Sequence, residues 1–134
     1  MLITNWQHVY FMKKLNLILS VGVLIPVALA YGLLPKTTMP LFFDIRLETT
    51  DTLNICRTIM MLYLGIVALL LRGIFQEKEW RNATILNTVF MGSLSAGRLL
   101  SLILDGKPSF ILIFGFFGEL ILSIFALHQL KKYL

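Results

Sequence analysis

The chain has 134 residues, of which 57% are hydrophobic and 14% are charged, and its formal net charge is +5. Soluble domains are about 45–50% apolar and about 25% charged, so this composition excludes an ordinary soluble domain and indicates a membrane protein. The basic residues stand at the ends of apolar runs and form no continuous stripe, which argues against a nucleic-acid partner. The single cysteine, Cys56, excludes an internal disulfide and a cysteine-rich metal centre.

The N-terminal residues MLITNWQHVYF fit a membrane span poorly, whereas MKKLNLILS from Met12 places two lysines before an apolar run. We expect residues 1–14 to be a leader that either lies along the membrane surface or comes from an upstream start codon. Residues 15–134 are expected to form a four-helix transmembrane domain. The stretch also resembles a signal peptide, but no convincing small-residue cleavage site follows it, so we expect the first helix to be retained.

Four apolar runs are long enough to cross a membrane, because a spanning helix needs about 20 apolar residues. They occupy residues 15–34, 57–75, 83–104 and 109–130. Each run exceeds the length of a normal strand and lacks an alternating pattern, so we predict α-helices. Pro26 lies inside the first run and is expected to kink or loosen that helix.

The connections between these runs predict how the helices are arranged. The longest, from Pro35 to Cys56, contains PLFFDI, which predicts a short amphipathic segment at the membrane interface, followed by an N-cap at Asp51 or Thr52. The connections QEKEWRN and DGKPS are short, so the second, third and fourth helices are expected to be antiparallel neighbours. The predicted fold is an all-α integral membrane protein with four transmembrane helices in an antiparallel bundle.

The basic residues predict the orientation of this bundle, since cytoplasmic loops of membrane proteins carry an excess of Lys and Arg. On one side of the four predicted helices lie Lys13, Lys14, Arg72, Lys78, Arg81, Lys131 and Lys132, and on the other lie Lys36, Arg46 and Lys107. The ratio of seven to three predicts that both termini are cytoplasmic.

Four ionisable residues lie in the predicted outer half of the membrane. At 1.5 Å per residue, Arg98 lies about 10 Å and Glu119 about 16 Å below the outer surface. Arg57 begins the second helix and Asp105 ends the third. A charged side chain at the bilayer centre costs about 2.5–3.5 kcal/mol, so we expect Arg98 to pair with Glu119, and Arg57 with Asp105 or Glu119.

Two interpretations of this polar cluster stay open. Asn54 and Ser101 add uncharged polar groups to it. The whole cluster either only holds the helices of the bundle together or is a functional site. A functional site would hold an anionic ligand or lipid headgroup at Arg57 and Arg98, or a proton at Glu119.

Small residues recur every fourth position along the third helix, at Ser93, Gly97 and Ser101. Such residues let helix backbones approach closely. We expect this ridge to pack either another helix of the same bundle or a second protein chain.

Sequence signals of catalysis are absent. His8 and His128 stand near opposite ends of the chain and have no partners at metal-ligand spacing, and no phosphate loop, dinucleotide-binding turn or HExxH motif occurs. We therefore expect no metal and no cofactor, and we disfavour an enzyme without excluding one.

The segments NICRTIMMLYLGIVALLL, EWRNATIL, GSLSAGRLLSLILDGKPS and GELILSIFAL resemble a family of small bacterial membrane proteins, known as domain of unknown function 4345. The resemblance covers roughly residues 33–134. Its pattern is matched by Asn54, Arg57, Gly97, Arg98, Asp105, Gly106, Pro108, Ser109 and Glu119, while Thr58 stands where relatives usually carry glycine. The resemblance implies a bacterial four-helix integral membrane protein. It does not indicate which activity such a protein has.

We predict a non-enzymatic protein of the bacterial cytoplasmic (inner) membrane, either an accessory subunit or a bundle that binds a small ligand or lipid. One alternative is an oligomeric, proton-coupled small transporter in which Glu119 titrates, and another is a lipid-modifying membrane enzyme. The expected partners are membrane lipids and a homo-oligomer or a larger membrane complex.

The orientation can be tested with reporter domains fused after Lys107 and after Leu134. We expect the two fusions to report opposite sides of the membrane, because the excess of basic residues places the C-terminus in the cytoplasm. Alkaline phosphatase and fluorescent-protein activities measure the side, and the same side for both fusions would contradict the four-span topology.

Overall fold

The computed structural model describes residues 2–134, with side chains from Gln7 onward, so Met1 of the expected leader lies outside it. The described chain is all-helical. Its elements are α1 (Leu2–Gly32), α2 (Pro35–Phe43), α3 (Thr50–Phe75), the short 3-10 helix η1 (Glu77–Glu79), α4 (Trp80–Leu104) and α5 (Phe110–Tyr133). Four helices are long and apolar enough to cross a membrane, and they lie within Gln7–Gly32, Thr50–Phe75, Glu77–Leu104 and Phe110–Tyr133. The prediction of an all-α chain with four such helices is confirmed.

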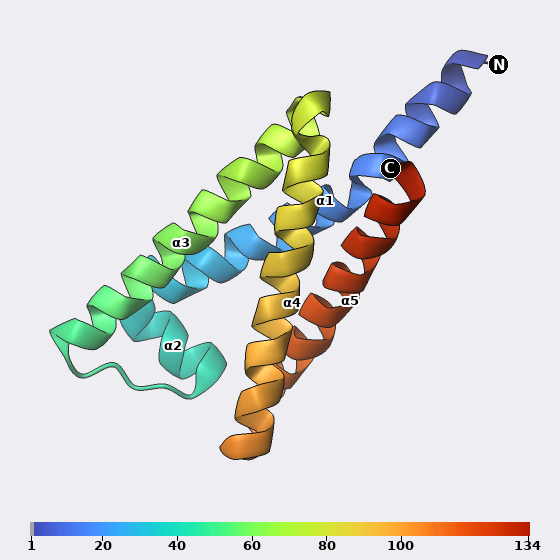
Figure 1. Ribbon diagram of the computed structural model, residues 1–134. Coiled ribbons are helices and arrows are strands. Elements are labelled where there is room, and N and C mark those ends of the chain that lie inside the picture. Colours follow the sequence, from blue (N-terminus) through green and yellow to red (C-terminus); the bar gives the residue numbers. More distant parts are fainter. Residues whose placement is uncertain (1) are drawn as a thin grey trace.

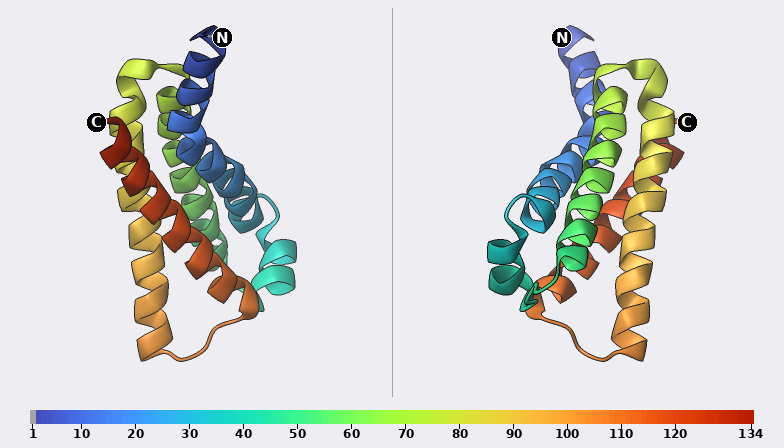
Figure 2. Two further views of the ribbon diagram at one scale, coloured as in Figure 1. Left: turned by 90° about the vertical axis from the view of Figure 1, so that its right-hand side faces the viewer. Right: turned by 90° about the vertical axis from the view of Figure 1, so that its left-hand side faces the viewer.

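The four long helices pack as two pairs. α1 packs mainly along α3, α4 packs mainly along α5, and contacts between α3 and α4 join the two pairs (Figure 1). Figure 2 shows both chain ends and the α3–α4 turn at one end of the molecule, which we call the terminal end. The opposite end, which carries α2 and the loop between α4 and α5, is called the α2 end.

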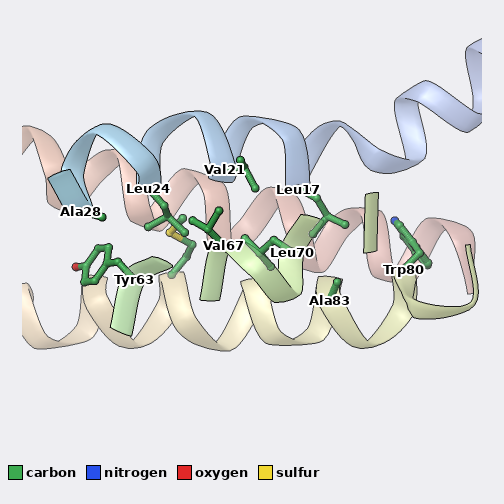
Figure 3. Close-up of a cluster of buried hydrophobic side chains, with 10 residues drawn as sticks. Leu17, Val21, Leu24, Ala28, Tyr63, Val67, Leu70, Trp80 and Ala83 are labelled. Atoms are coloured by element: carbon green, nitrogen blue, oxygen red, sulfur yellow. The ribbon is translucent and has the colours of Figure 1, made fainter. Parts of the chain in front are cut away.

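The apolar core lies where α1, α3 and α4 meet (Figure 3). Its side chains recur at steps of three and four residues, which places them on one face of each helix. The core comprises Leu17, Val21, Leu24 and Ala28 of α1, Tyr63, Val67 and Leu70 of α3, and Trp80, Ala83 and Met91 of α4. The outward faces of the same helices remain apolar and exposed, as at Leu62 and Val89, which suits contact with lipid tails.

Gly73 lets the three core helices approach closely near the terminal end. A Cβ atom at this position would overlap the side chain of Ala83 and would lie 3.0 Å from Cδ1 of Leu17. Small residues at such a crossing let backbones come together, which is the main source of packing between helices in lipid.

Two lysines fasten α1 to the α3–α4 turn. The Nζ atom of Lys14 donates a hydrogen bond to the backbone carbonyl of Ile74 at 2.6 Å and lies 3.4 Å from a Glu77 carboxylate oxygen. Lys13 forms an ion pair with Glu77, and its backbone carbonyl accepts a hydrogen bond from Nε1 of Trp80 at 2.8 Å. The side chain of Lys14 is only 3% exposed, so these partners replace water for its ammonium group.

Three local expectations from the sequence differ from the structure. α1 is one helix from Leu2 to Gly32, so residues 2–14 continue into the first span without a break in the helix. The second long helix begins at Thr50 rather than near Arg57, because Thr49 caps it by accepting a hydrogen bond from the backbone N–H of Thr52 at 3.2 Å. The N-cap is therefore Thr49, and the prediction of Asp51 or Thr52 is wrong. Asp51 instead places its charge in the first turn, where the helix dipole favours an acid.

The substitution Gly73→Ala tests the close approach of the three core helices. The added methyl group has no room beside Ala83, and overpacking of this kind costs about 1–3 kcal/mol. We expect a lower midpoint of thermal unfolding in mild detergent. Gly65→Ala on the same helix is the matched control, because a Cβ there meets no atom within 4 Å, and an equal loss in both variants would contradict the explanation.

Candidate functional site

An ion pair between Arg98 of α4 and Glu119 of α5 joins these two helices. Nε of Arg98 donates to Oε2 of Glu119 at 2.7 Å, and Nη2 donates to Oε1 at 2.8 Å. The two side chains are 22% and 11% exposed, so both charges are largely removed from the surroundings. A two-point arginine–carboxylate contact fixes the orientation of both planar groups and is among the stronger hydrogen-bonded arrangements in proteins.

Small residues between α4 and α5 make room for this ion pair. Gly115 lies one helical turn before Glu119, and a Cβ there would stand 3.5 Å from Cζ of Arg98, so the guanidinium lies directly against the α5 backbone. A Cβ at Gly92 would stand closer still, 3.0 Å from Oγ of Ser123, and the Ser123 hydroxyl donates to the backbone carbonyl of Thr88 at 2.9 Å. The sequence therefore builds a close helix crossing, and the arginine lies at its open side.

A cavity of about 470 Å³ lies beside the ion pair, in the size range of small-molecule sites. α1 and α3 each contribute a tyrosine, α4 contributes small and polar residues, and α5 contributes apolar ones. The lining residues are Tyr31, Tyr63, Ser93, Leu94, Gly97, Arg98, Ser101, Leu102, Pro108, Leu112, Ile113, Phe116 and Phe117. Figure 2 shows α4 and α5 diverging toward the loop that joins them, on the side where Pro108 and Ser101 lie. We call this cavity the α4–α5 cleft.

The remaining members of the predicted polar cluster lie apart from the ion pair. Arg57 is exposed, and its Nη1 donates to the backbone carbonyl of Gly32 at 3.1 Å. Asp105 accepts a hydrogen bond from the Ser101 hydroxyl at 2.8 Å. Among residues 7–134, neither residue forms an ion pair within 4.0 Å, so the structure does not contain the expected pairing of Arg57 with Asp105 or Glu119.

Asn54 is also exposed and lies one turn before Thr58. The Thr58 hydroxyl donates to the backbone carbonyl of Asn54 at 2.9 Å. It therefore contributes no side-chain contact to the ion pair. The predicted cluster thus separates into the Arg98–Glu119 pair, a Ser101–Asp105 contact at the end of α4, and an Arg57 contact that ties α3 to the end of α1.

The ridge of small residues on α4 lines the cleft instead of packing on another helix of the chain. Ser93, Gly97 and Ser101 all border the cavity. A Cβ at Gly97 would meet no atom within 4 Å, so no described helix lies against it. Within the chain, α4 is approached closely at Gly92 instead.

Some polar groups of the interior escaped the sequence analysis. Tyr31 and Tyr63 stand in the predicted spans and could have been noticed as aromatic residues with a polar tip inside apolar runs. Ser20 of α1 accepts a hydrogen bond from Nδ2 of Asn87 of α4 at 2.9 Å, and both residues are fully buried. The signal for this contact was present, because each residue is a polar position inside a predicted membrane span.

A family model for a domain of unknown function (DUF4345) matches residues 12–130, which is most of the chain. The chain belongs to this family. None of the curated proteins and none of the solved structures compared with this DUF4345 chain matches it. The match includes the whole cleft and the ion pair, while no group of three or more potential metal ligands occurs among the residues that the structure describes.

Single and double substitutions test the ion pair. Removing one partner leaves an uncompensated charge at a largely buried position and costs about 3–5 kcal/mol, whereas replacing both partners by apolar residues of similar size costs little. We therefore expect Arg98→Met and Glu119→Leu each to lower the thermal midpoint sharply, and the double variant to regain most of the loss. Unfolding of the four proteins in mild detergent gives the coupling energy, and additive losses would mean that the two side chains do not stabilise each other.

Proposed function

We propose that this DUF4345 protein is a non-enzymatic small integral membrane protein that binds a small apolar ligand or lipid in the α4–α5 cleft. The observation that carries the proposal is the cavity itself, with one ion pair at its wall and an otherwise mostly apolar lining. Binding sites for small molecules combine a mostly apolar surface with a few fixed polar groups in this way.

The position of Gly97 supports a binding role over a purely structural one. An ion pair that only joins two helices is expected to be closely packed on all sides. The space over Gly97, next to the Arg98 side chain, is open. Arg98 uses Nε and Nη2 for Glu119, which leaves Nη1 for a further hydrogen bond. The pair can therefore hold the helices together and still offer a donor to a ligand.

We also propose that the four long helices form an antiparallel bundle in the inner membrane of a bacterium, with both termini in the cytoplasm. Two observations support this orientation: the excess of basic residues at the helix ends on that side, and the position of both chain ends at the terminal end of the molecule (Figure 2). The α4–α5 cleft would then lie in the outer half of the bilayer, with membrane lipids as the surrounding partners. A homo-oligomer or a larger membrane complex is a further proposal for the exposed helix faces.

The substitution Gly97→Leu tests ligand binding without disturbing the fold. The added side chain enters the cleft and meets no described atom at its Cβ, so we expect unchanged thermal stability and loss of binding. The probe is methyl hexadecanoate carrying a diazirine in its chain, incorporated into phosphatidylcholine vesicles that contain the protein. Photolabelling of the segment 112–117 should saturate with probe concentration in the wild type and disappear in Gly97→Leu.

Gly118→Leu is the matched control, because Gly118 also has open space at its Cβ and does not line the cleft. Labelling that stays linear with probe concentration, or that is equal in all three proteins, would contradict a ligand site. A wild type that elutes as a dimer, with Gly97→Leu eluting as a monomer and no saturable labelling, would assign the ridge to self-association instead.

A further inference from the structure

Every polar side chain that lines the α4–α5 cleft can donate a hydrogen bond. Tyr63 is 5% exposed, and Figure 3 shows its hydroxyl directed away from the aliphatic core side chains. Tyr31 lies beside it with the ring centroids 5.9 Å apart, and both rings line the cleft together with Arg98. Within residues 7–134, neither of these two hydroxyls makes a hydrogen bond, whereas the hydroxyl of Tyr10 elsewhere is bonded to Lys14. Neither hydroxyl is among the fully buried polar atoms without a partner in the described residues, so both are open to the cleft, where a ligand that supplies an acceptor can bond to them.

The one carboxylate beside the cleft, that of Glu119, is already occupied. Both carboxylate oxygens of Glu119 receive hydrogen bonds from Arg98, and Arg98 has no acceptor of its own. The free groups at this end of the cleft are therefore the Nη1 atom of Arg98 and the two tyrosine hydroxyls. A carbonyl or ester oxygen complements this set.

The electrostatics of the cleft disfavour a charged head group. Arg98 is the one ionisable lining residue besides the tyrosines, and Glu119 neutralises it. An anion placed next to Arg98 would also stand near the Glu119 carboxylate, and like charges repel strongly where the dielectric constant is low. A cation would stand next to the guanidinium, which repels it, and the Glu119 carboxylate that could offset its charge is already paired with Arg98.

The apolar part of the cleft sets the size of the ligand. A volume of about 470 Å³ holds on the order of fifteen water-sized groups, since each occupies roughly 30 Å³ in a liquid. This corresponds to one hydrocarbon chain with its head group. Leu112, Ile113, Phe116 and Phe117 of α5 form the surface along which such a chain lies, and Phe117 is 55% exposed, so the cleft opens laterally toward lipid.

We infer that the α4–α5 cleft selects an uncharged, single-chain amphiphile whose head group carries a carbonyl or ester acceptor, held by the Tyr63 and Tyr31 hydroxyls and by Nη1 of Arg98. This inference rests on the proposed ligand-binding function and names the chemical class of the ligand. The hydrocarbon part lies along α5 and enters the cleft from the bilayer.

Competition among three unlabelled compounds of equal chain length tests the head-group selectivity. Photolabelling of the wild type by the diazirine probe is measured against methyl hexadecanoate, hexadecanoate and hexadecane in the same vesicles at pH 8. We expect the ester to compete at least tenfold better than the carboxylate and the alkane, because it alone is both neutral and an acceptor.

The variant Tyr63→Phe removes one hydroxyl and keeps the ring that packs against Phe90. Loss of one hydrogen bond should weaken competition by the ester roughly two- to tenfold and leave that of the alkane unchanged. Tyr133→Phe, outside the cleft, is the control and should behave as the wild type.

The outcomes separate this inference from the proposed function. Saturable labelling in which hexadecanoate competes as well as or better than the ester would overturn the inference and leave the ligand site standing. Equal competition by all three compounds, or no effect of Tyr63→Phe, would likewise overturn the head-group assignment. Absence of saturable labelling by the ester probe and equally by a hexadecanoate probe that carries the same diazirine would overturn the proposed function itself.

Discussion

Arg98 and Glu119 are largely buried between two predominantly apolar helices, and neither charge is stable in such surroundings without the other. Burial removes the water that would solvate a guanidinium or a carboxylate, so the free energy of each group depends on the hydrogen bonds that the partner provides. This requirement fixes the register of α4 against α5. A shift of one helix by one turn along its axis would displace one charged group by about 5.4 Å relative to the other and break both hydrogen bonds. Gly115 follows from the same constraint, since a larger side chain there would occupy the place of the guanidinium.

The register of the two helices in turn creates the cleft. Close approach at Gly92 and Ser123 and at the ion pair holds α4 and α5 together along their middle portions, while their ends at the α2 end diverge. In the diverging part, aromatic and aliphatic side chains from the two helices leave a cavity between them. The cleft thus arises as a geometric result of the helix crossing, without any loop dedicated to it.

Much of the fold follows from the amino-acid sequence alone. The length of the apolar runs predicts four helices, and the cost of unpaired charge in lipid predicts that Arg98 faces Glu119, which the two hydrogen bonds match. The partner of Arg57 could not be predicted in this way, because a backbone carbonyl such as that of Gly32 leaves no mark in the sequence. The cleft escaped prediction for a similar reason, since small residues such as Gly97 serve equally well for close packing and for open space.

The attachment of α1 to the α3–α4 turn has a consequence for how the protein is made. Trp80, which donates to the carbonyl of Lys13, lies 67 residues further along the chain. At synthesis rates of about 5–20 residues per second, α1 leaves the ribosome roughly 3–13 s before its partners exist. During that interval the ammonium group of Lys14 must remain among lipid headgroups and water at the membrane surface. The final seating of α1 therefore waits until the α3–α4 turn has been made, although α1 precedes α3 along the chain.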